Sequence, residues 1–183
     1  KGKTTEYQAD HIVIATGARA RQLPNVRIDG KKIIEYRKAM SMEHQPKKMV
    51  VMGSGAIGSE FAYFYNSIGT EVTIVEYLDN IVPREDEEVS KQLGRTFKKN
   101  GIKIMTGAAV EKVDTSGSGC KVHVNTKKGE EVLECDVVLS AVGVSPNTEN
   151  IGLEDVGIAT DRGMITVDEF YKTNIPGYYA IGD

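Results

Sequence analysis

The stretch Met49-Val50-Val51-Met52-Gly53-Ser54-Gly55-Ala56-Ile57-Gly58, with Glu71-Val72-Thr73-Ile74-Val75-Glu76 after it, decides the fold of this 183-residue chain. The continuous apolar run over 49–52 is typical of a central parallel strand, and the β-branched residues over 71–76 favour a second strand. Between them, apolar residues at helical spacing predict one helix face, formed by Ile57, Phe61, Phe64, Tyr65 and Ile68. The stretch therefore predicts a strand–turn–helix–strand unit.

The glycines of the turn have the spacing Gly-x-Gly-x-x-Gly, which is weak evidence alone but here follows a strand and opens a helix. In such a turn, Gly53 allows a tight bend, Gly55 lets the backbone approach a pyrophosphate, and Gly58 lets the helix pack close to the strand. The free N–H groups at the start of the helix favour negative charge. We therefore predict a dinucleotide site rather than a purely structural turn.

Two acidic residues accompany the predicted site. Glu76 ends the second strand, where a carboxylate can accept hydrogen bonds from the adenosine ribose and repel a 2′-phosphate. Two unit charges about 4 Å apart interact by roughly 4 kcal/mol at an effective dielectric of about 20, so we expect NAD(H) to be preferred over NADP(H). Glu60 lies in the first helical turns, and its spacing fits a dipole-stabilising surface acid as well as a nucleotide contact.

The rest of the chain predicts further elements. The run His11–Ala15 is expected to be a buried strand, followed by a connector over 18–46 that holds a short helix at Ile33–Met42. A second helix is predicted over 85–101, with Val89, Leu93 and Phe97 on one face, and a third parallel strand over 102–105. Further strands are expected at Val110–Asp114, Lys121–Thr126, Glu131–Leu139, Met164–Val167 and Tyr178–Ile181. The first three of these would form an antiparallel β-meander, whereas 150–163 would be loop with a short strand.

The composition of the chain limits which classes of function it can have. Apolar residues make up 40% of the chain, which suffices for a core, and the net charge of −3 gives no reason to expect nucleic acid or an acidic membrane as partner. No apolar run approaches the roughly 20 residues that span a bilayer. Cys120 and Cys135 have neither metal-site nor C-x-x-C spacing, so we expect small buried or edge-strand residues in a reduced, cytoplasmic setting. Because the chain has no initiating Met and stops at a strand-like run, we expect it to be a piece of a longer chain.

Several motifs, taken together and in order, resemble the pyridine nucleotide-disulfide oxidoreductases, most closely the dihydrolipoamide dehydrogenase branch. They are Ile14-Ala15-Thr16-Gly17, Gly53-Ser54-Gly55-Ala56-Ile57-Gly58-Ser59-Glu60, Ile81-Val82-Pro83, Ser140-Ala141-Val142-Gly143, Pro146-Asn147, Asp161-Arg162-Gly163 and Tyr179-Ala180-Ile181-Gly182-Asp183. The resemblance implies an α/β fold: a Rossmann-type βαβαβ parallel sheet with an antiparallel β-meander, flanked by strands of a split FAD domain. It further implies three segments: an FAD-domain edge strand and connector over 1–46, an NAD-binding domain over 47–145, and a return segment over 146–183.

The resemblance also implies roles for single residues. Gly53, Ser54, Gly55, Ala56, Ile57, Gly58, Ser59 and Glu60 match the NAD loop, with Glu60 on the nicotinamide side. Glu76 matches the acid that binds the ribose, while Val110 and Gly143 match backbone positions near the adenine and nicotinamide ends. Thr16, Gly17 and Asp183 match FAD contacts. No catalytic or metal-binding residue is implied within this chain. This sequence departs from the family pattern at Val144-Ser145, which stand where the resemblance implies an Arg. The basic contact that such an Arg would make to the nucleotide is therefore not expected from these two residues.

As an activity, the resemblance implies electron transfer from a dithiol through a redox disulfide and FAD to NAD+. The expected partners are lipoyl groups on the acyltransferases of 2-oxo acid dehydrogenase complexes and a second copy in a homodimer. The family's C-x-x-x-x-C and its His–Glu base are not found in this sequence, so this chain alone is expected to bind nucleotide without turning over lipoamide. Two alternatives stay open: a sister flavoenzyme such as an NADH oxidase, and a dinucleotide-binding sensor without chemistry.

Overall fold

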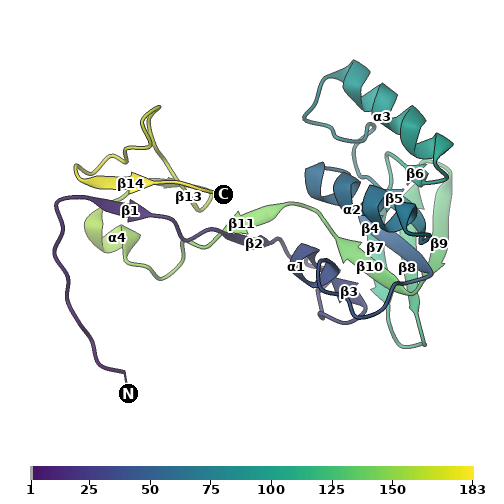
Figure 1. Ribbon diagram of the computed structural model, residues 1–183, viewed down its shortest axis with the longest axis horizontal. Helices are drawn as coiled ribbons and strands as arrows, with labels where there is room; N and C mark the ends of the chain where they lie inside the picture. Colours follow the sequence, from purple (N-terminus) through teal and green to yellow (C-terminus); the bar gives the residue numbers. More distant parts are fainter. Residues whose placement is uncertain (1) are drawn as a thin grey trace. The chain divides into compact units, whose positions relative to one another are not determined.

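The computed structural model describes residues 2–183, which form two compact units (Figure 1). The larger unit comprises Ala20–Gly143, and the smaller combines the chain up to Arg19 with Val144–Asp183. Among the described residues, none of the helices combines the length and apolar character that crossing a bilayer requires.

A five-stranded parallel sheet organises the larger unit. Its strand order is β3 (Ile33–Ile34), β10 (Val137–Ser140), β4 (Lys48–Met52), β5 (Glu71–Val75) and β6 (Lys103–Met105). Every neighbouring pair in this order is parallel. The strands β4, β5 and β10 are buried along most of their length, as expected for a sheet covered on both faces.

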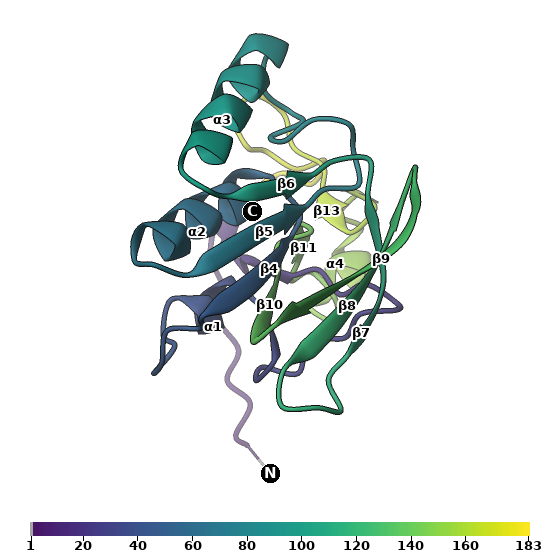
Figure 2. The same cartoon turned by 90° about the vertical axis from the view of Figure 1, so that its right-hand side faces the viewer.

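Helices cover one face of this sheet. The helix α2 (Ala56–Ser67) connects β4 to β5, and α3 (Glu87–Lys99) connects β5 to β6. Figure 2 shows both helices on the same side of the strands. Ala62 and Tyr65 of α2 and Phe97 of α3 pack there against the apolar side chains of the sheet. The predicted βαβαβ unit is therefore present, and the predicted fold class is confirmed.

An antiparallel meander covers the other face. It consists of β7 (Ala109–Asp114), β8 (Cys120–Thr126) and β9 (Gly129–Cys135), with β8 in the middle. Val122 and Val124 of β8 are buried in a second apolar cluster together with residues of β4, β5 and β10. The meander and the helices thus enclose the parallel sheet between them (Figure 2).

The smaller unit contains short strands. β1 (Ile12–Ile14) pairs in parallel with β14 (Tyr178–Ala180), and β12 (Thr160–Asp161) pairs with β13 (Met164–Ile165) in antiparallel fashion. The short helix α4 (Leu153–Val156) precedes β12. β2 (Ala18–Ala20) and β11 (Val144–Pro146) pair where the chain passes from one unit to the other.

The single strand predicted over 131–139 is wrong, because the chain there forms two strands in different sheets. β9 ends the meander at Cys135, and β10 begins the central sheet at Val137. Asp136 stands between them, and its carboxylate accepts hydrogen bonds from the N–H groups of Lys47 (2.8 Å) and Lys48 (2.9 Å). This contact anchors the turn to the beginning of β4.

The connector expected over 18–46 is also different in the structure. Ile33 and Ile34 are buried and pair with β10, so they form strand rather than helix. The helix α1 (Tyr36–Ala39) begins after Glu35, whose carboxylate caps the N–H groups of the first turn. Residues Ala20–Gly143 therefore form the larger compact unit, which includes most of this connector. The division into an FAD-domain edge and connector over 1–46, an NAD-binding domain over 47–145 and a return segment over 146–183 stays a prediction.

Several apolar faces are narrower than their periodicity predicts. Phe64 is 53% exposed, and Ile68 and Val89 are exposed as well, because only the side of each helix that holds Ala62, Tyr65 or Phe97 meets the sheet. Val13 of β1 is 56% exposed, so the strand expected to be buried is not, since within the described residues it pairs with β14 alone. The helix α4 lies in a segment that was expected to be loop and strand.

Candidate functional site

The glycine-rich turn lies at the carboxyl end of β4. Gly55 is the N-cap residue of α2, and no side chain accepts a hydrogen bond at this cap. The turn is bonded to the neighbouring strand, because the N–H group of Gly53 donates to the carbonyl of Val75 at 2.9 Å. The first N–H groups of α2 therefore point from the edge of the sheet with no side-chain cap, a geometry suited to an anion.

The three glycines of the turn differ in what a side chain would meet. Gly53 has φ +91°, and a Cβ there would lie 2.5 Å from the carbonyl oxygen of Ala141. A Cβ on Gly58 would overlap the carbonyl oxygen of Gly53 and lie 3.3 Å from the Cβ of Ala141. A Cβ on Gly55, in contrast, would meet nothing within 4 Å. Packing within the chain requires the first and third glycines, whereas the second borders open space.

Glu76 lies beside this turn at the end of β5 and is only 7% exposed. Its Oε2 accepts hydrogen bonds from the N–H group (2.8 Å) and from the hydroxyl (2.6 Å) of Ser54. Its Oε1 accepts a hydrogen bond from the N–H group of Leu78 at 2.9 Å. The structure therefore brings the acid predicted to bind ribose together with the glycine-rich turn.

Ser54 and Ser59 tie the turn to its surroundings. The hydroxyl of Ser59 donates to the carbonyl of Ser54 at 2.9 Å, and the N–H group of Val82 donates to the same carbonyl at 3.0 Å. Both serines are buried. Their hydroxyls therefore serve contacts inside the protein, which the spacing of the motif did not indicate.

The remaining loop residues lie nearer the surface. Ala56 and Glu60 are exposed on α2, and Ile57 is half-buried against the apolar cluster under the helix. Glu60 is on the exposed side of the helix, where an acid can stabilise the helix dipole or contact a nucleotide. Together with Phe61 and Tyr65, Ile57 is the part of the predicted helix face that packs against the core in the structure.

Val110 and Gly143 are held by contacts that the sequence did not suggest. The carbonyl of Val110 accepts a hydrogen bond from Nδ2 of Asn25 at 3.1 Å. Gly143 has φ +102°, and its carbonyl accepts a hydrogen bond from the N–H group of Arg21 at 3.0 Å. The guanidinium carbon of Arg21 lies 4.0 Å from where a Cβ of Gly143 would be. A positive charge therefore lies beside Gly143, although Val144-Ser145 stand where the family resemblance implies an arginine.

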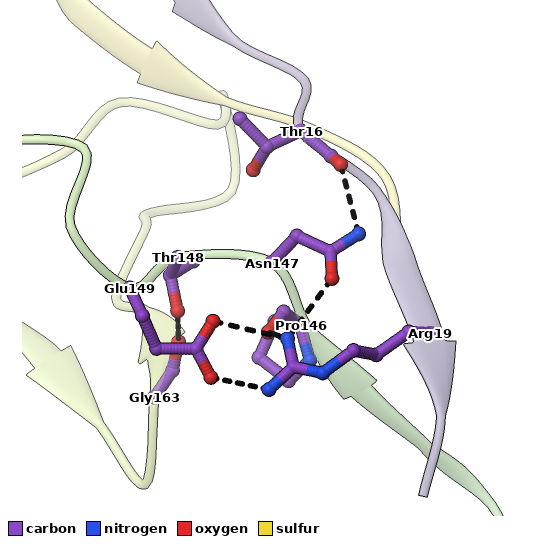
Figure 3. Close-up of polar contacts among 7 residues, drawn as sticks. All are labelled: Thr16, Arg19, Pro146, Asn147, Thr148, Glu149 and Gly163. Atoms are coloured by element: carbon purple, nitrogen blue, oxygen red, sulfur yellow. Dashed lines mark hydrogen bonds and ion pairs between the residues drawn. The ribbon is translucent and has the colours of Figure 1, made fainter.

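In the smaller unit, Thr16 and Gly17 are joined to Asn147. The carbonyl of Thr16 accepts a hydrogen bond from Nδ2 of Asn147 at 3.2 Å, and the carbonyl of Gly17 accepts one from its N–H group at 2.8 Å. Figure 3 shows how Thr16 and Asn147 approach each other. Asp183, the third residue matched to an FAD contact, is exposed at the end of the chain.

Arg19 makes further hydrogen bonds to the segment that contains Asn147 (Figure 3). Its Nη1 donates to the carbonyl of Pro146 at 3.0 Å and to Oδ1 of Asn147 at 2.9 Å, and both nitrogens of its fork contact the carboxylate of Glu149. The ion pair raises the pKa of Arg19 and lowers the pKa of Glu149. Neither charged residue stood out in the sequence, because more than a hundred residues separate them.

The two cysteines lie directly opposite each other on β8 and β9. Both are buried, and their thiols are free. Burial raises the pKa of the Cys135 thiol to about 12 and also raises that of Cys120. Within residues 2–183, no cluster of three or more His, Cys, Asp or Glu side chains has a geometry that could hold a metal ion.

Comparisons with known proteins agree with this architecture. The family described as pyridine nucleotide-disulphide oxidoreductase matches residues 1–183. A dihydrolipoyl dehydrogenase of Rhizobium etli is 48% identical over 184 residues, which cover 100% of this chain and 38% of that protein. One from Zymomonas mobilis is 46% identical, with 100% of this chain and 40% of that protein covered. A leghemoglobin reductase of Glycine max is 42% identical, with 100% and 36% covered.

Solved structures give the same result. The crystal structure of LpdA from Mycobacterium tuberculosis superimposes with a TM-score of 0.90 at 34% identity, covering 100% of this chain and 39% of that one. The HOCl-induced flavoprotein disulfide reductase RclA of Escherichia coli gives a TM-score of 0.81 at 28% identity, covering 94% and 39%. The chain thus spans about two fifths or less of the length of these proteins. Because a family match covers the entire sequence and its motifs occur in order, the chain belongs to the pyridine nucleotide-disulphide oxidoreductases.

Proposed function

We propose that the larger unit binds NAD(H) for a flavin-dependent disulfide oxidoreductase that oxidises dihydrolipoyl groups. The observation that carries this proposal is the buried carboxylate of Glu76, held against the glycine-rich turn at the carboxyl edge of the parallel sheet. Ligands of open α/β sheets bind at this edge. A carboxylate there can accept a hydrogen bond from a ribose hydroxyl of NAD(H) and disfavours a 2′-phosphate.

The residues of the turn fit a dinucleotide. The open space beside Gly55 admits a pyrophosphate next to the backbone, and the N–H groups at the start of α2 donate to it. The guanidinium of Arg21 beside Gly143 adds a positive charge near the predicted nicotinamide end. Hydride transfer between flavin and nicotinamide belongs to the cofactors when they are bound, whereas these residues bind and orient the nucleotide.

We propose FAD as the second cofactor, with contacts from Thr16, Gly17 and Asp183 in the smaller unit. A Cβ on Gly17 would meet nothing within 4 Å, so this turn leaves room beside its backbone. The names of the relatives support dihydrolipoyl groups as the substrate. From the resemblance to this family, we propose a lipoyl-bearing acyltransferase of a 2-oxo acid dehydrogenase complex as partner, and a homodimer as the assembly.

A second candidate is a sister enzyme that reduces a different substrate. The similarity to RclA, a flavoprotein disulfide reductase, favours it at lower identity than the dihydrolipoyl dehydrogenases. The substrate assay distinguishes the two. Turnover of dihydrolipoamide with NAD+ by the flavin-containing protein supports the first candidate, and NADH oxidation by oxygen without lipoamide turnover supports the second.

The nucleotide assignment is tested by calorimetric titration of the purified protein with NADH and with NADPH at one salt concentration. We expect NADH to bind at least tenfold more tightly, since even a third of the roughly 4 kcal/mol repulsion between two charges gives that factor. Glu76→Arg should narrow or invert the preference. Glu71→Gln changes an acid at the opposite end of β5 and is the control. This variant should keep the preference of the parent for NADH over NADPH. Equal affinities for the two nucleotides in the unchanged protein would refute the assignment.

A further inference from the structure

We propose that Ser54 is a positioning residue for Glu76, and that the preference for NAD(H) over NADP(H) depends on its hydroxyl. This inference rests on the proposed function, because it concerns how the same site recognises ribose. It goes beyond the motif, in which Ser54 is only one of three variable residues between the glycines. The structure instead gives its side chain a single acceptor, the carboxylate of Glu76.

The hydrogen bonds that Glu76 accepts within the protein leave few acceptor positions for a ligand. Each carboxylate oxygen accepts about two hydrogen bonds. Oε2 already accepts two, from the N–H group and the hydroxyl of Ser54, whereas Oε1 accepts one, from Leu78. One acceptor position therefore remains on Oε1. Glu76 would bind a ribose hydroxyl through Oε1, while Oε2 serves to hold the carboxylate in place.

Ser54 is itself held firmly enough to do this. Its exposed fraction is 0%, and its carbonyl accepts hydrogen bonds from Val82 and Ser59. A buried hydroxyl that leaves its acceptor without finding another is unfavourable. The hydroxyl therefore stays on Oε2, and the carboxylate keeps one orientation.

A fixed carboxylate discriminates better than a mobile one. When three donors hold Glu76, it cannot turn aside to relieve repulsion from a 2′-phosphate. If the Ser54 hydroxyl is removed, one of the two bonds to Oε2 is lost, and the carboxylate gains freedom to rotate. The penalty against NADPH then falls, whereas contacts of the pyrophosphate with the glycine-rich turn are unaffected.

The test is titration of Ser54→Ala with NADH and with NADPH. We expect the ratio of the two affinities to fall about tenfold, the effect of about 1.4 kcal/mol. Ser54→Cys replaces the hydroxyl with a somewhat larger thiol that is a weaker donor, so its affinity ratio should lie between those of the parent and the Ala variant. Ser90→Ala is the matched control, because Ser90 is a buried serine whose hydroxyl donates to the carbonyl of Val82 (3.3 Å) rather than to Glu76.

A double-mutant cycle shows whether Ser54 acts through Glu76. In a Glu76→Ala background, Ser54→Ala should change the affinity ratio no further. If Ser54→Ala weakens both nucleotides equally while the parent prefers NADH, Ser54 is merely structural and the inference is overturned. A parent without any preference for NADH would overturn the proposed function, and this inference with it.

Discussion

At the residue scale, Gly58 is a position that the packing of the chain requires to be glycine. Its missing Cβ would overlap the Gly53 carbonyl oxygen, which is backbone and cannot move aside like a flexible side chain. We expect Gly58→Ala to lower the free energy of unfolding by about 1–3 kcal/mol, the usual range for overpacking. Urea denaturation of the purified variant measures this change.

The control for Gly58→Ala is another helical glycine with room around it. A Cβ on Gly94, in the middle of α3, would lie 3.8 Å from Ile81 Cδ1, an ordinary contact. Since alanine has the higher helix propensity, Gly94→Ala should raise stability by about 0.5–1 kcal/mol. Similar stability of the two variants would contradict the close approach of α2 to the turn.

Gly55 is expected to matter for the ligand and not for the fold. Its φ of −63° is accessible to any residue, and a Cβ there meets nothing within 4 Å. We expect Gly55→Val to keep the thermal unfolding temperature of the parent and to lose measurable NADH binding, because the side chain fills the space next to the backbone N–H groups. A Gly55→Val variant that binds NADH as the parent does would show that this turn is structural only.

The buried cysteines give the protein a pH dependence at the alkaline end. Since burial raises the pKa of Cys135 to about 12, the folded state keeps a proton that the unfolded state loses above about pH 9. The contribution of the protonated Cys135 thiol to the free energy of unfolding is therefore complete below about pH 9, and it is lost as the pH rises toward 12. Unfolding curves between pH 8 and pH 11 should show decreasing stability, with a shallower decrease in Cys135→Ala. An equally steep decrease in that variant would assign the effect to other groups.

At the element scale, the beginning of α3 depends on one side chain. Asp86 is the N-cap residue, and its carboxylate accepts a hydrogen bond from the N–H group of Glu88 at 2.8 Å. We expect Asp86→Ala to lower the free energy of unfolding by about 1 kcal/mol, the usual loss for an N-cap. Asp86→Asn keeps an oxygen acceptor and should lose less. If the two variants are equally stable, the cap does not stabilise the helix.

At the scale of the whole molecule, the two units differ in how much apolar surface they bury. The larger unit has clusters on both faces of its sheet, whereas few side chains of the smaller unit are buried, among them Leu153 and Ile158. Hydrogen exchange of the 183-residue chain should therefore be slowest in β4, β5 and β10 and faster in β1 and β14. Protection of β1 equal to that of β4 would contradict this difference, because local stability follows buried contacts.

How far the sequence predicts the structure depends on sequence separation. The strand over 49–52, the glycine-rich turn and the following helix and strand are determined locally, since periodicity, glycine spacing and β-branched residues all act over short segments. The family motifs likewise occur in order and identify the family. Periodicity could not show that Phe64 is exposed, because a helix pattern does not tell how much of it the sheet will cover.

The sequence by itself therefore determined the βαβ unit, the family and the acid at the end of the second strand. Only the tertiary structure decided what surrounds that acid: Ser54 is 22 residues from Glu76, and the two meet because β4 and β5 are neighbours. It also brought Arg21 next to Gly143 and paired Arg19 with Glu149. The two residues of each pair lie more than a hundred residues apart in the chain. The physical reason is that hydrogen bonds and ion pairs depend on distances in space, and a residue pattern contains no distance between segments until the sheet order is known.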